Sequence, residues 1–189
     1  MKVCKEIKPS PIEIINKIDI KYVLEKNFDN TFMKLAAIIL AAGHSRRFKS
    51  NIPKQFHFYK KDIILNHSIK KFEKIKQIKE IYIAINNKYQ KKYSSLIKKT
   101  KKIKFFNGGK YRCETVKKGV EKLYRKYTHV LIHDAARPDF TIKLAQKLIK
   151  ELKKNSCVVP VITCSDTTVL EKNYVNRDKI KLLQTPQAF

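Results

Sequence analysis

The chain has 189 residues, and 43 lysines and arginines against 16 acidic residues give it a formal net charge of +27. This length suits one domain with a core of its own, and the longest strictly apolar run, residues 35–42, is far too short to cross a membrane. Only six of the basic residues are arginine, and the lysines are spread along the chain, which is typical of solvated faces and makes nucleic acid an unlikely partner.

The four cysteines are Cys4, Cys113, Cys157 and Cys164. They show neither a CxxC pair nor the spacing of a disulfide framework, so we expect reduced thiols and a cytoplasmic protein. Arginine makes planar, two-pronged contacts to phosphates and carboxylates that lysine does not replace. The six arginines are therefore candidate ligands, with Arg125 the one most readily explained by chance.

Residues 1–32 differ in composition from the rest of the chain, because they carry six lysines and five acids and are nearly neutral. They have no long apolar core for a secretory signal, and five acids without an arginine do not suit a transit peptide. Met33 directly precedes the first strongly apolar run. We expect residues 1–32 to be an amino-terminal extension of unknown role and residues 33–189 to be the domain.

The stretch 35–56 is the most informative part of the sequence. Its apolar run Leu35–Ala42 predicts a buried strand, which ends at Gly43 in a polar loop. The cations of that loop are Arg46, Arg47 and Lys54. Backbone amides and fixed cations after a strand can hold phosphates, although an ordinary strand-to-helix turn is the alternative. The loop is not a Walker A motif, since Phe48 stands where a second glycine is needed.

The remaining elements alternate between helices and strands. Apolar spacing predicts helices over 63–75, 88–99, 112–127 and 141–152, and strands over 80–86, 104–107, 129–133 and 157–162. Thr141 suits a helix N-cap, and residues 165–189 contain short extended pieces. This alternation predicts an α/β fold, with an open, mostly parallel, Rossmann-like sheet covered by helices on both faces.

Three polar clusters follow strands of this predicted sheet: Gly43–Lys54, Gly108–Thr115 and Asp134–Pro138. Ligands of such sheets bind beyond the carboxyl ends of the strands, so we expect one shared site. Its cations and its single carboxylate suit a triphosphate with Mg²⁺, which Asp134 could hold; a loop or capping carboxylate is the alternative reading. Arg47 and Lys54 could neutralise charge during phosphoryl transfer.

Histidine and cysteine chemistry is less well supported. His133 alternates into a strand and is more often a core histidine than a catalytic one, and nothing in the sequence pairs His44. Cys113 would need a base that the sequence does not identify.

The motifs AAIILAAGHSRRF, PKQF, GGKYRCET, HDAARP, DTT and QTPQAF resemble, in order and spacing, those of the 2-C-methyl-D-erythritol 4-phosphate cytidylyltransferases. The resemblance runs from about Leu35 to Phe189. Ribitol-5-phosphate cytidylyltransferases share PKQF and the fold, but AAG and DAARP favour the methylerythritol family. The resemblance implies a transferase of the nucleotide-diphospho-sugar type that converts CTP and methylerythritol phosphate into diphosphocytidyl-methylerythritol and pyrophosphate, for isoprenoid synthesis by the non-mevalonate pathway.

The resemblance also implies roles for individual residues. The catalytic pair is Arg47 and Lys54. The nucleotide-binding residues are Ala41, Ala42, Gly43, Gly108, Gly109, Arg112, Thr115, Asp134 and Arg137, with Asp134 also near Mg²⁺ or another divalent cation. The residues for methylerythritol phosphate are Thr167, Arg177 and Thr185. Arg177 is expected to reach across a homodimer from an arm at about 164–182.

Two departures from the family pattern affect these expectations. Ser45 replaces the second glycine of the usual Gly-x-Gly, which we expect to keep the turn and add a hydroxyl. The family continues past the QTPQAF motif through a helix, a strand and a helix with further site residues, so we expect a domain without its carboxy-terminal third, from a fragment or a truncated gene. The same motifs also open bifunctional enzymes fused to a cyclodiphosphate synthase. The alternative from another class is an inactive basic binding protein on the same fold.

Overall fold

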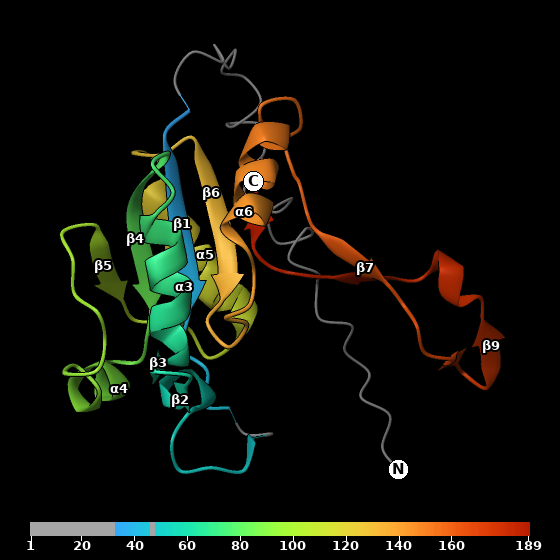
Figure 1. Ribbon diagram of the computed structural model, residues 1–189, viewed down its shortest axis with the longest axis horizontal. Helices are drawn as coiled ribbons and strands as arrows, with labels where there is room; N and C mark the ends of the chain where they lie inside the picture. Colours follow the sequence, from blue (N-terminus) through green and yellow to red (C-terminus); the bar gives the residue numbers. More distant parts are fainter. Residues whose placement is uncertain (1–32, 46–47) are drawn as a thin grey trace.

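The computed structural model describes residues 33–45 and 48–189, and a five-stranded sheet lies at its centre (Figure 1). The strand order is β11-β6-β1-β4-β5; β1, β4, β5 and β6 are parallel and β11 is antiparallel to β6. The bounds are β1 (Leu35–Leu40), β4 (Ile78–Ala84), β5 (Ile103–Phe106), β6 (His129–Asp134) and β11 (Gln187–Ala188). The predicted α/β class with an open, mostly parallel sheet is confirmed.

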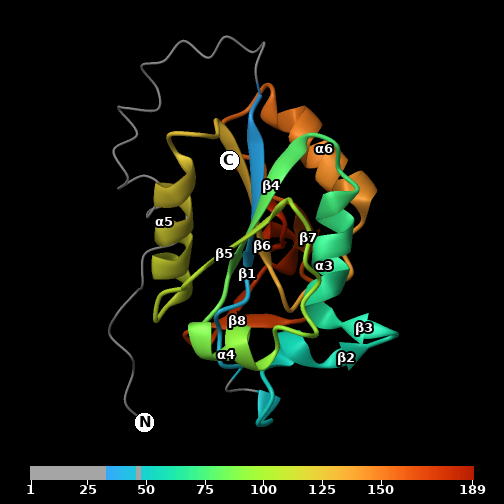
Figure 2. The same cartoon turned by 90° about the vertical axis from the view of Figure 1, so that its left-hand side faces the viewer.

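Helices cover both faces of this sheet. They are α3 (Ile64–Glu73), α5 (Arg112–Leu123) and α6 (Ile142–Leu152), while the short α4 (Asn87–Lys92) lies at the lower end of the strands in Figure 1. Figure 2 shows α5 on one face and α3 with α6 on the other. Alternating residues of β1 explain this arrangement: Ala37 and Ile39 belong to the core under α3 and α6, while Ala36 and Ile38 belong to the core under α5. Every one of these side chains is buried, as expected for a central parallel strand.

The strand register brings the connecting loops together. Leu40 at the end of β1 pairs with Ala84 of β4 on one side and with Asp134 of β6 on the other, and Ala84 pairs with Phe106 of β5. Four parallel strands therefore end at one level, at the lower edge of the sheet in Figure 1. A 3-10 helix, η2 (Lys54–Phe56), and a hairpin of β2 (Phe58–Tyr59) and β3 (Asp62–Ile63) lead from this edge into α3.

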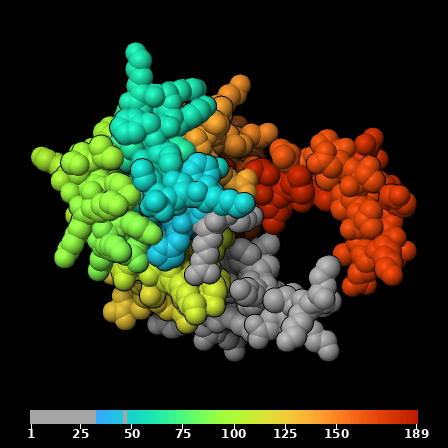
Figure 3. Space-filling view, turned by 90° about the horizontal axis from the view of Figure 1, so that it is seen from below, coloured from blue at the N-terminus to red at the C-terminus, as the bar shows by residue number. Residues whose placement is uncertain are grey.

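Residues 161–183 form an arm that projects from the sheet and its helices (Figures 1 and 3). Its strands are β7 (Val161–Thr163), β8 (Thr168–Leu170), β9 (Asn173–Val175) and β10 (Lys181–Leu183), with η3 (Arg177–Lys179) between the last two. β7 pairs with β10 and β8 with β9, both antiparallel. The predicted short extended pieces of the tail are confirmed.

Two predicted elements differ from the structure. The strand predicted over 157–162 is wrong as a single element, because Pro160 lacks an amide proton and divides it; Val158 makes one bridge to Ala188 and the rest begins the arm. The helix predicted over 88–99 ends at Lys92, where Tyr93 leaves helical geometry and stacks on Phe56 at 4.3 Å between ring centroids. In the described part of the chain, no helix has the length and apolar character needed to span a membrane.

Candidate functional site

The loop after β1 is held in shape by two polar side chains. The side-chain amide of Gln55 donates from Nε2 to the carbonyl oxygens of Ala41 at 2.7 Å and Gly43 at 3.0 Å. The Ser45 hydroxyl accepts from the Lys54 amide at 3.0 Å and donates to Gln55 Oε1 at 3.2 Å. Ser45 has φ 52°, which is in the left-handed region that favours glycine. Its two hydrogen bonds compensate for the backbone strain of a serine at this position. Gln55 is a site residue that the sequence did not reveal, although it lies within the PKQF motif.

The cations of this loop are only partly within the described structure. Arg46 and Arg47 lie outside the described residues, so their predicted role stays a prediction. Lys54 begins η2 and is half-buried, and its side chain lines a pocket that is described below.

The loop after β5 packs directly on the first loop. A Cβ atom on Gly108 would lie 2.3 Å from the Cβ of Ala42, and one on Gly109 would lie 2.4 Å from the Cβ of Glu114. Among the described residues, nothing lies within 4 Å of the position that a Cβ of Gly43 would take. We expected all three glycines to admit a ligand; for Gly108 and Gly109, contacts within the chain alone already require glycine, while Gly43 faces open space.

The start of α5 is closed by hydrogen bonds within its own turn. Thr115 is buried, and its hydroxyl accepts from the Gly109 amide and donates to the Tyr111 carbonyl, both at 3.0 Å. Glu114 Oε2 accepts from the Lys110 amide at 2.8 Å. Thr115 thus shapes the second loop, and its predicted contact with the cytosine base stays a prediction.

Asp134 links the other loops. Its Oδ1 accepts from Arg112 Nε at 3.1 Å, and its Oδ2 lies 3.4 Å from Arg137 Nε. Arg137 Nη1 in turn donates to Gln184 Oε1 at 2.7 Å. The first turn of α5, the loop after β6 and the segment before β11 therefore meet around one carboxylate with two guanidinium groups beside it.

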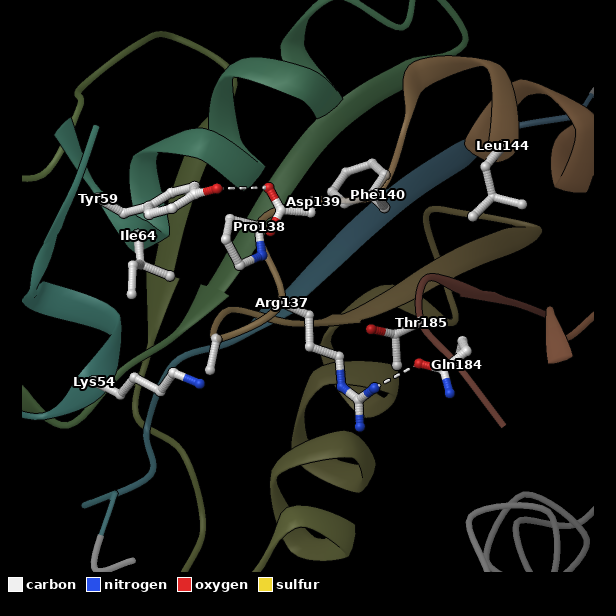
Figure 4. A pocket seen from close by; sticks show the side chains of 11 residues that line it. Lys54, Tyr59, Ile64, Arg137, Pro138, Asp139, Phe140, Leu144, Gln184 and Thr185 are labelled. Carbon is white, nitrogen blue, oxygen red and sulfur yellow. Dashed lines mark hydrogen bonds between the residues drawn. The ribbon is translucent and has the colours of Figure 1, made fainter. Parts of the chain in front are cut away.

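A pocket of about 510 Å³ opens beside Arg137 and Gln184, next to the Asp134 carboxylate (Figure 4). Its polar side chains belong to Lys54, Arg137, Asp139, Gln184 and Thr185, and its other lining residues include Tyr59, Ile64, Pro138, Phe140 and Leu144. The Tyr59 hydroxyl and Asp139 Oδ1 are 3.5 Å apart at the rim. The predicted catalytic Lys54, nucleotide-binding Arg137 and substrate-binding Thr185 thus share one cavity, whose mixed lining suits a small phosphorylated compound.

His133 is fully buried behind the pocket residues Phe140 and Thr185, and it packs against the rings of Phe72 and Phe140, which also contact each other at 4.9 Å between centroids. Burial lowers the pKa of His133 to about 4 against the opposing effect of Asp134, so the imidazole is neutral near neutral pH. The core histidine that we expected is confirmed. His44, for which the sequence offered no partner, has its Nδ1 2.8 Å from the Tyr89 hydroxyl.

Two predicted substrate residues are on the arm. Thr167 precedes β8 and Arg177 begins η3, where its Nη1 donates to the Ser165 carbonyl at 3.1 Å. Both are exposed, and neither lines the pocket. Within one chain, the structure does not bring them to Thr185.

Seen from the side of the loops, residues 33–45 and 48–60 lie beside the chain around the start of α5, while the arm stands apart (Figure 3). A parallel sheet with cations and glycines at the carboxyl ends of its strands is typical of nucleotide-binding α/β enzymes. Comparison with known proteins defines the family. The family model described as IspD, 2-C-methyl-D-erythritol 4-phosphate cytidylyltransferase, matches residues 35–189, and the chain belongs to this family.

Individual relatives agree with this assignment. The chain is 42% identical over 164 residues to the bifunctional enzyme IspD/IspF of Pelagibacter ubique, covering 83% of this chain and 43% of that enzyme. It is 39% identical over 163 residues to the 2-C-methyl-D-erythritol 4-phosphate cytidylyltransferase of Caldicellulosiruptor bescii, covering 83% of this chain and 73% of that protein. The chain therefore spans less than half of the bifunctional relative and about three quarters of the single-function one.

Solved structures show the same fold. The bifunctional IspDF of Campylobacter jejuni has a TM-score of 0.70 at 33% identity, covering 82% of this chain and 40% of that one. The IspD of Francisella tularensis has a TM-score of 0.66 at 27% identity, covering 82% of this chain and 71% of that one. Enzymes of this family are divalent-metal-dependent nucleotidyltransferases.

Proposed function

We propose that this chain carries the cytidylyltransferase active site that makes 4-diphosphocytidyl-2-C-methyl-D-erythritol and pyrophosphate from CTP and 2-C-methyl-D-erythritol 4-phosphate. One observation carries the proposal: loops that are far apart in an IspD-family sequence meet at one sheet edge, around Asp134 and a cavity lined by Lys54, Arg137 and Thr185. On this basis residues 33–189 form the nucleotidyltransferase domain of a cytoplasmic enzyme.

The reaction needs positioning and charge neutralisation more than proton transfer. The phosphate of the second substrate is already anionic near neutral pH and attacks the α-phosphorus of CTP in line, and pyrophosphate leaves. Lys54 and Arg47 are the proposed groups that neutralise charge as it develops on the triphosphate. The Ser45 and Gln55 hydrogen bonds support this role for Lys54, because they hold its backbone against the first loop.

The nucleotide is proposed to lie over Ala41, Ala42 and Gly43 and against the Gly108–Thr115 turn. The open space at Gly43 supports this placement, since a phosphate can approach the backbone there.

Asp134 is the proposed anchor for a divalent cation. Mg²⁺ in nucleotide sites needs only one or two carboxylates, because phosphate oxygens and water supply the other ligands. Among the described residues, each oxygen of Asp134 contacts one guanidinium group, so each keeps a lone pair for such an ion. The bound cation would neutralise triphosphate charge, while Arg112 and Arg137 keep the carboxylate in place.

The methylerythritol phosphate is proposed to occupy the pocket beside Thr185. Thr167 and Arg177 serve this site only if a second copy of the chain supplies them, which is why we propose a homodimer through the arm at about 164–182. The exposed apolar side chains of the arm support this assembly, since such surfaces are typical of interfaces.

Pyrophosphate release tests the proposal. The chain with CTP and Mg²⁺ is expected to release pyrophosphate with methylerythritol phosphate and not with ribitol 5-phosphate. Lys54→Met is expected to lower kcat by about 10²–10³-fold, whereas Lys60→Met in the β2–β3 turn serves as the matched control and is expected to keep it. Turnover only with ribitol 5-phosphate would contradict the substrate. No turnover, with no protection of the fold by CTP, would favour the inactive binding protein.

A further inference from the structure

A chain of three buried side chains connects the core to the pocket. Ser68 on α3, His133 on β6 and Thr185 before β11 are at most 8% exposed. Ser68 Oγ lies 3.2 Å from His133 Nε2, and Thr185 Oγ1 lies 3.0 Å from His133 Nδ1. The Asp134 amide also donates to Thr185 Oγ1, at 3.4 Å. These contacts join three segments of the chain behind the Thr185 hydroxyl, beside which we propose that the phosphate of the second substrate binds.

The directions of these hydrogen bonds follow from the donors available. A neutral imidazole has one N–H and one acceptor nitrogen. Among the described residues, His133 Nε2 is the only hydrogen-bond partner of the Ser68 hydroxyl. A buried hydroxyl proton without an acceptor is costly, so Ser68 donates to Nε2 and the imidazole proton sits on Nδ1. His133 Nδ1–H then points to Thr185 Oγ1, and the backbone of Arg137 makes a further hydrogen bond with the imidazole.

In this arrangement, Thr185 Oγ1 accepts from two donors, His133 Nδ1–H and the Asp134 amide. Its own proton is therefore not used by His133 and is available to an acceptor in the pocket that Thr185 lines. In the tautomer protonated at Nε2, the Thr185 hydroxyl would donate its proton to Nδ1 and would present only lone pairs to the pocket, which repel an anion. The tautomer of His133 thus decides whether Thr185 can bind a phosphate.

We propose that Ser68 and His133 are positioning residues that hold the Thr185 hydroxyl as a hydrogen-bond donor to the phosphate of the second substrate. This inference rests on the proposed function, which makes Thr185 a ligand of that phosphate. The predicted effect falls on substrate binding, because neither Ser68 nor His133 reaches the reacting atoms.

The tautomer can be measured without turnover. Nitrogen-15 NMR of the histidine side chains in the full chain is expected to show His133 protonated at Nδ1 and unprotonated at Nε2. Ser68→Ala, a small change, removes the donor to Nε2 and is expected to yield a mixture of tautomers. A wild-type imidazole protonated at Nε2 would overturn the inference, and so would an unchanged tautomer in Ser68→Ala.

Two substitutions of His133 by amide side chains test the two ring nitrogens separately. The amide of His133→Asn can replace Nδ1 toward Thr185, whereas the amide of His133→Gln replaces Nε2 toward Ser68. His133→Gln is expected to weaken binding of methylerythritol phosphate, and of inorganic phosphate as a simple probe, by about tenfold, as Thr185→Val does; His133→Asn is expected to stay within about threefold of wild type. The change should appear in KM and not in kcat.

His129 at the other end of β6 provides the matched control. Its Nδ1 lies 2.7 Å from the Thr128 hydroxyl, so it makes a similar contact far from the pocket. His129→Asn and His129→Gln are expected to bind both probes like wild type. Equal loss in His133→Asn and His133→Gln, in step with their melting temperatures, would show a structural effect only and overturn the inference. A wild type that neither binds methylerythritol phosphate nor releases pyrophosphate would instead contradict the proposed function. The NMR measurement would still identify the tautomer of His133 in that case.

Discussion

The sheet and its helices bury their apolar side chains, whereas the arm exposes its apolar side chains. Ile81 on β4 is 0% exposed beneath α3, whereas Ile162 on β7 is 53% exposed and Tyr174 on β9 is 82% exposed. In the part of the chain that the structure describes, each pair of strands in the arm forms a separate two-stranded sheet. Such ribbons are marginally stable alone in water.

This difference separates two sources of stability. The sheet satisfies its apolar residues within one chain, so its strands are stabilised by their own core. The arm has an apolar surface with no core beneath it, which is the pattern of a surface that another molecule covers. The homodimer proposed above would cover it and would carry Thr167 and Arg177 toward a site in the partner.

The strongest contrast is expected from the same substitution in both regions. Ile81→Ala removes a fully buried side chain and is expected to lower the free energy of unfolding by about 2–5 kcal/mol. Ile162→Ala is expected to change it by less than about 0.5 kcal/mol in dilute solution. Urea unfolding midpoints check both values, and comparable losses would contradict the division into a core and an uncovered arm.

Within the sheet region, alanine substitutions at two glycines separate an effect on packing from an effect on CTP binding. Gly108→Ala places a Cβ against Ala42 and is expected to cost about 1–3 kcal/mol of stability and to weaken CTP binding. The new Cβ of Gly43→Ala meets no described residue within 4 Å, so this variant is expected to keep stability while still weakening CTP binding. Thermal unfolding and CTP titration measure the two effects; full CTP affinity in Gly43→Ala would exclude close approach of the phosphates there.

The arm can be tested with a matched pair of tyrosines. Tyr174→Glu places a charge on its apolar surface and is expected to weaken self-association by about tenfold or more. Tyr124→Glu, on the exposed side after α5 and 57% exposed in the wild type, is expected to leave association unchanged. Sedimentation over a concentration series provides the measurement, and a wild-type chain that stays monomeric throughout would contradict the homodimer.

The smallest expected effect concerns pH and Glu80 of β4. Burial alone would raise the pKa of Glu80, but hydrogen bonds from Tyr127, Lys126 and Tyr82 outweigh it and lower the pKa to about 2. Because the folded pKa lies below the ordinary 4.5, this contribution to stability is complete above about pH 4.5 and is lost as the pH falls toward 2.

Glu80→Gln should therefore show a shallower loss of stability with acid than wild type between those pH values. Tyr127→Phe removes one donor and raises the folded pKa of Glu80 toward 4.5, so the loss should be smaller than in wild type and should be complete at a higher pH. Denaturation at several pH values reveals the difference, and parallel curves for all three proteins would refute this account of Glu80.

Local patterns in the sequence determined much of the architecture. The apolar run at 35–42 predicted β1, the spacing of apolar residues predicted α3 and α5, and Thr141 predicted the start of α6, where its hydroxyl accepts from the Leu144 amide at 3.0 Å. These features depend on neighbours a few residues apart, which the periodicity of helices and strands makes visible. The ordered motifs likewise indicated the family that the comparisons confirm.

Only the tertiary structure decided how the site is held together. The contact of Gly108 with Ala42, the carboxylate of Asp134 between Arg112 and Arg137, and the line from Ser68 through His133 to Thr185 all join residues far apart in the chain. Such contacts depend on strand register and on helix packing, for which no local pattern exists. For the same reason the sequence could suggest extended pieces in the tail, but only the fold showed that they leave the sheet and present an apolar arm.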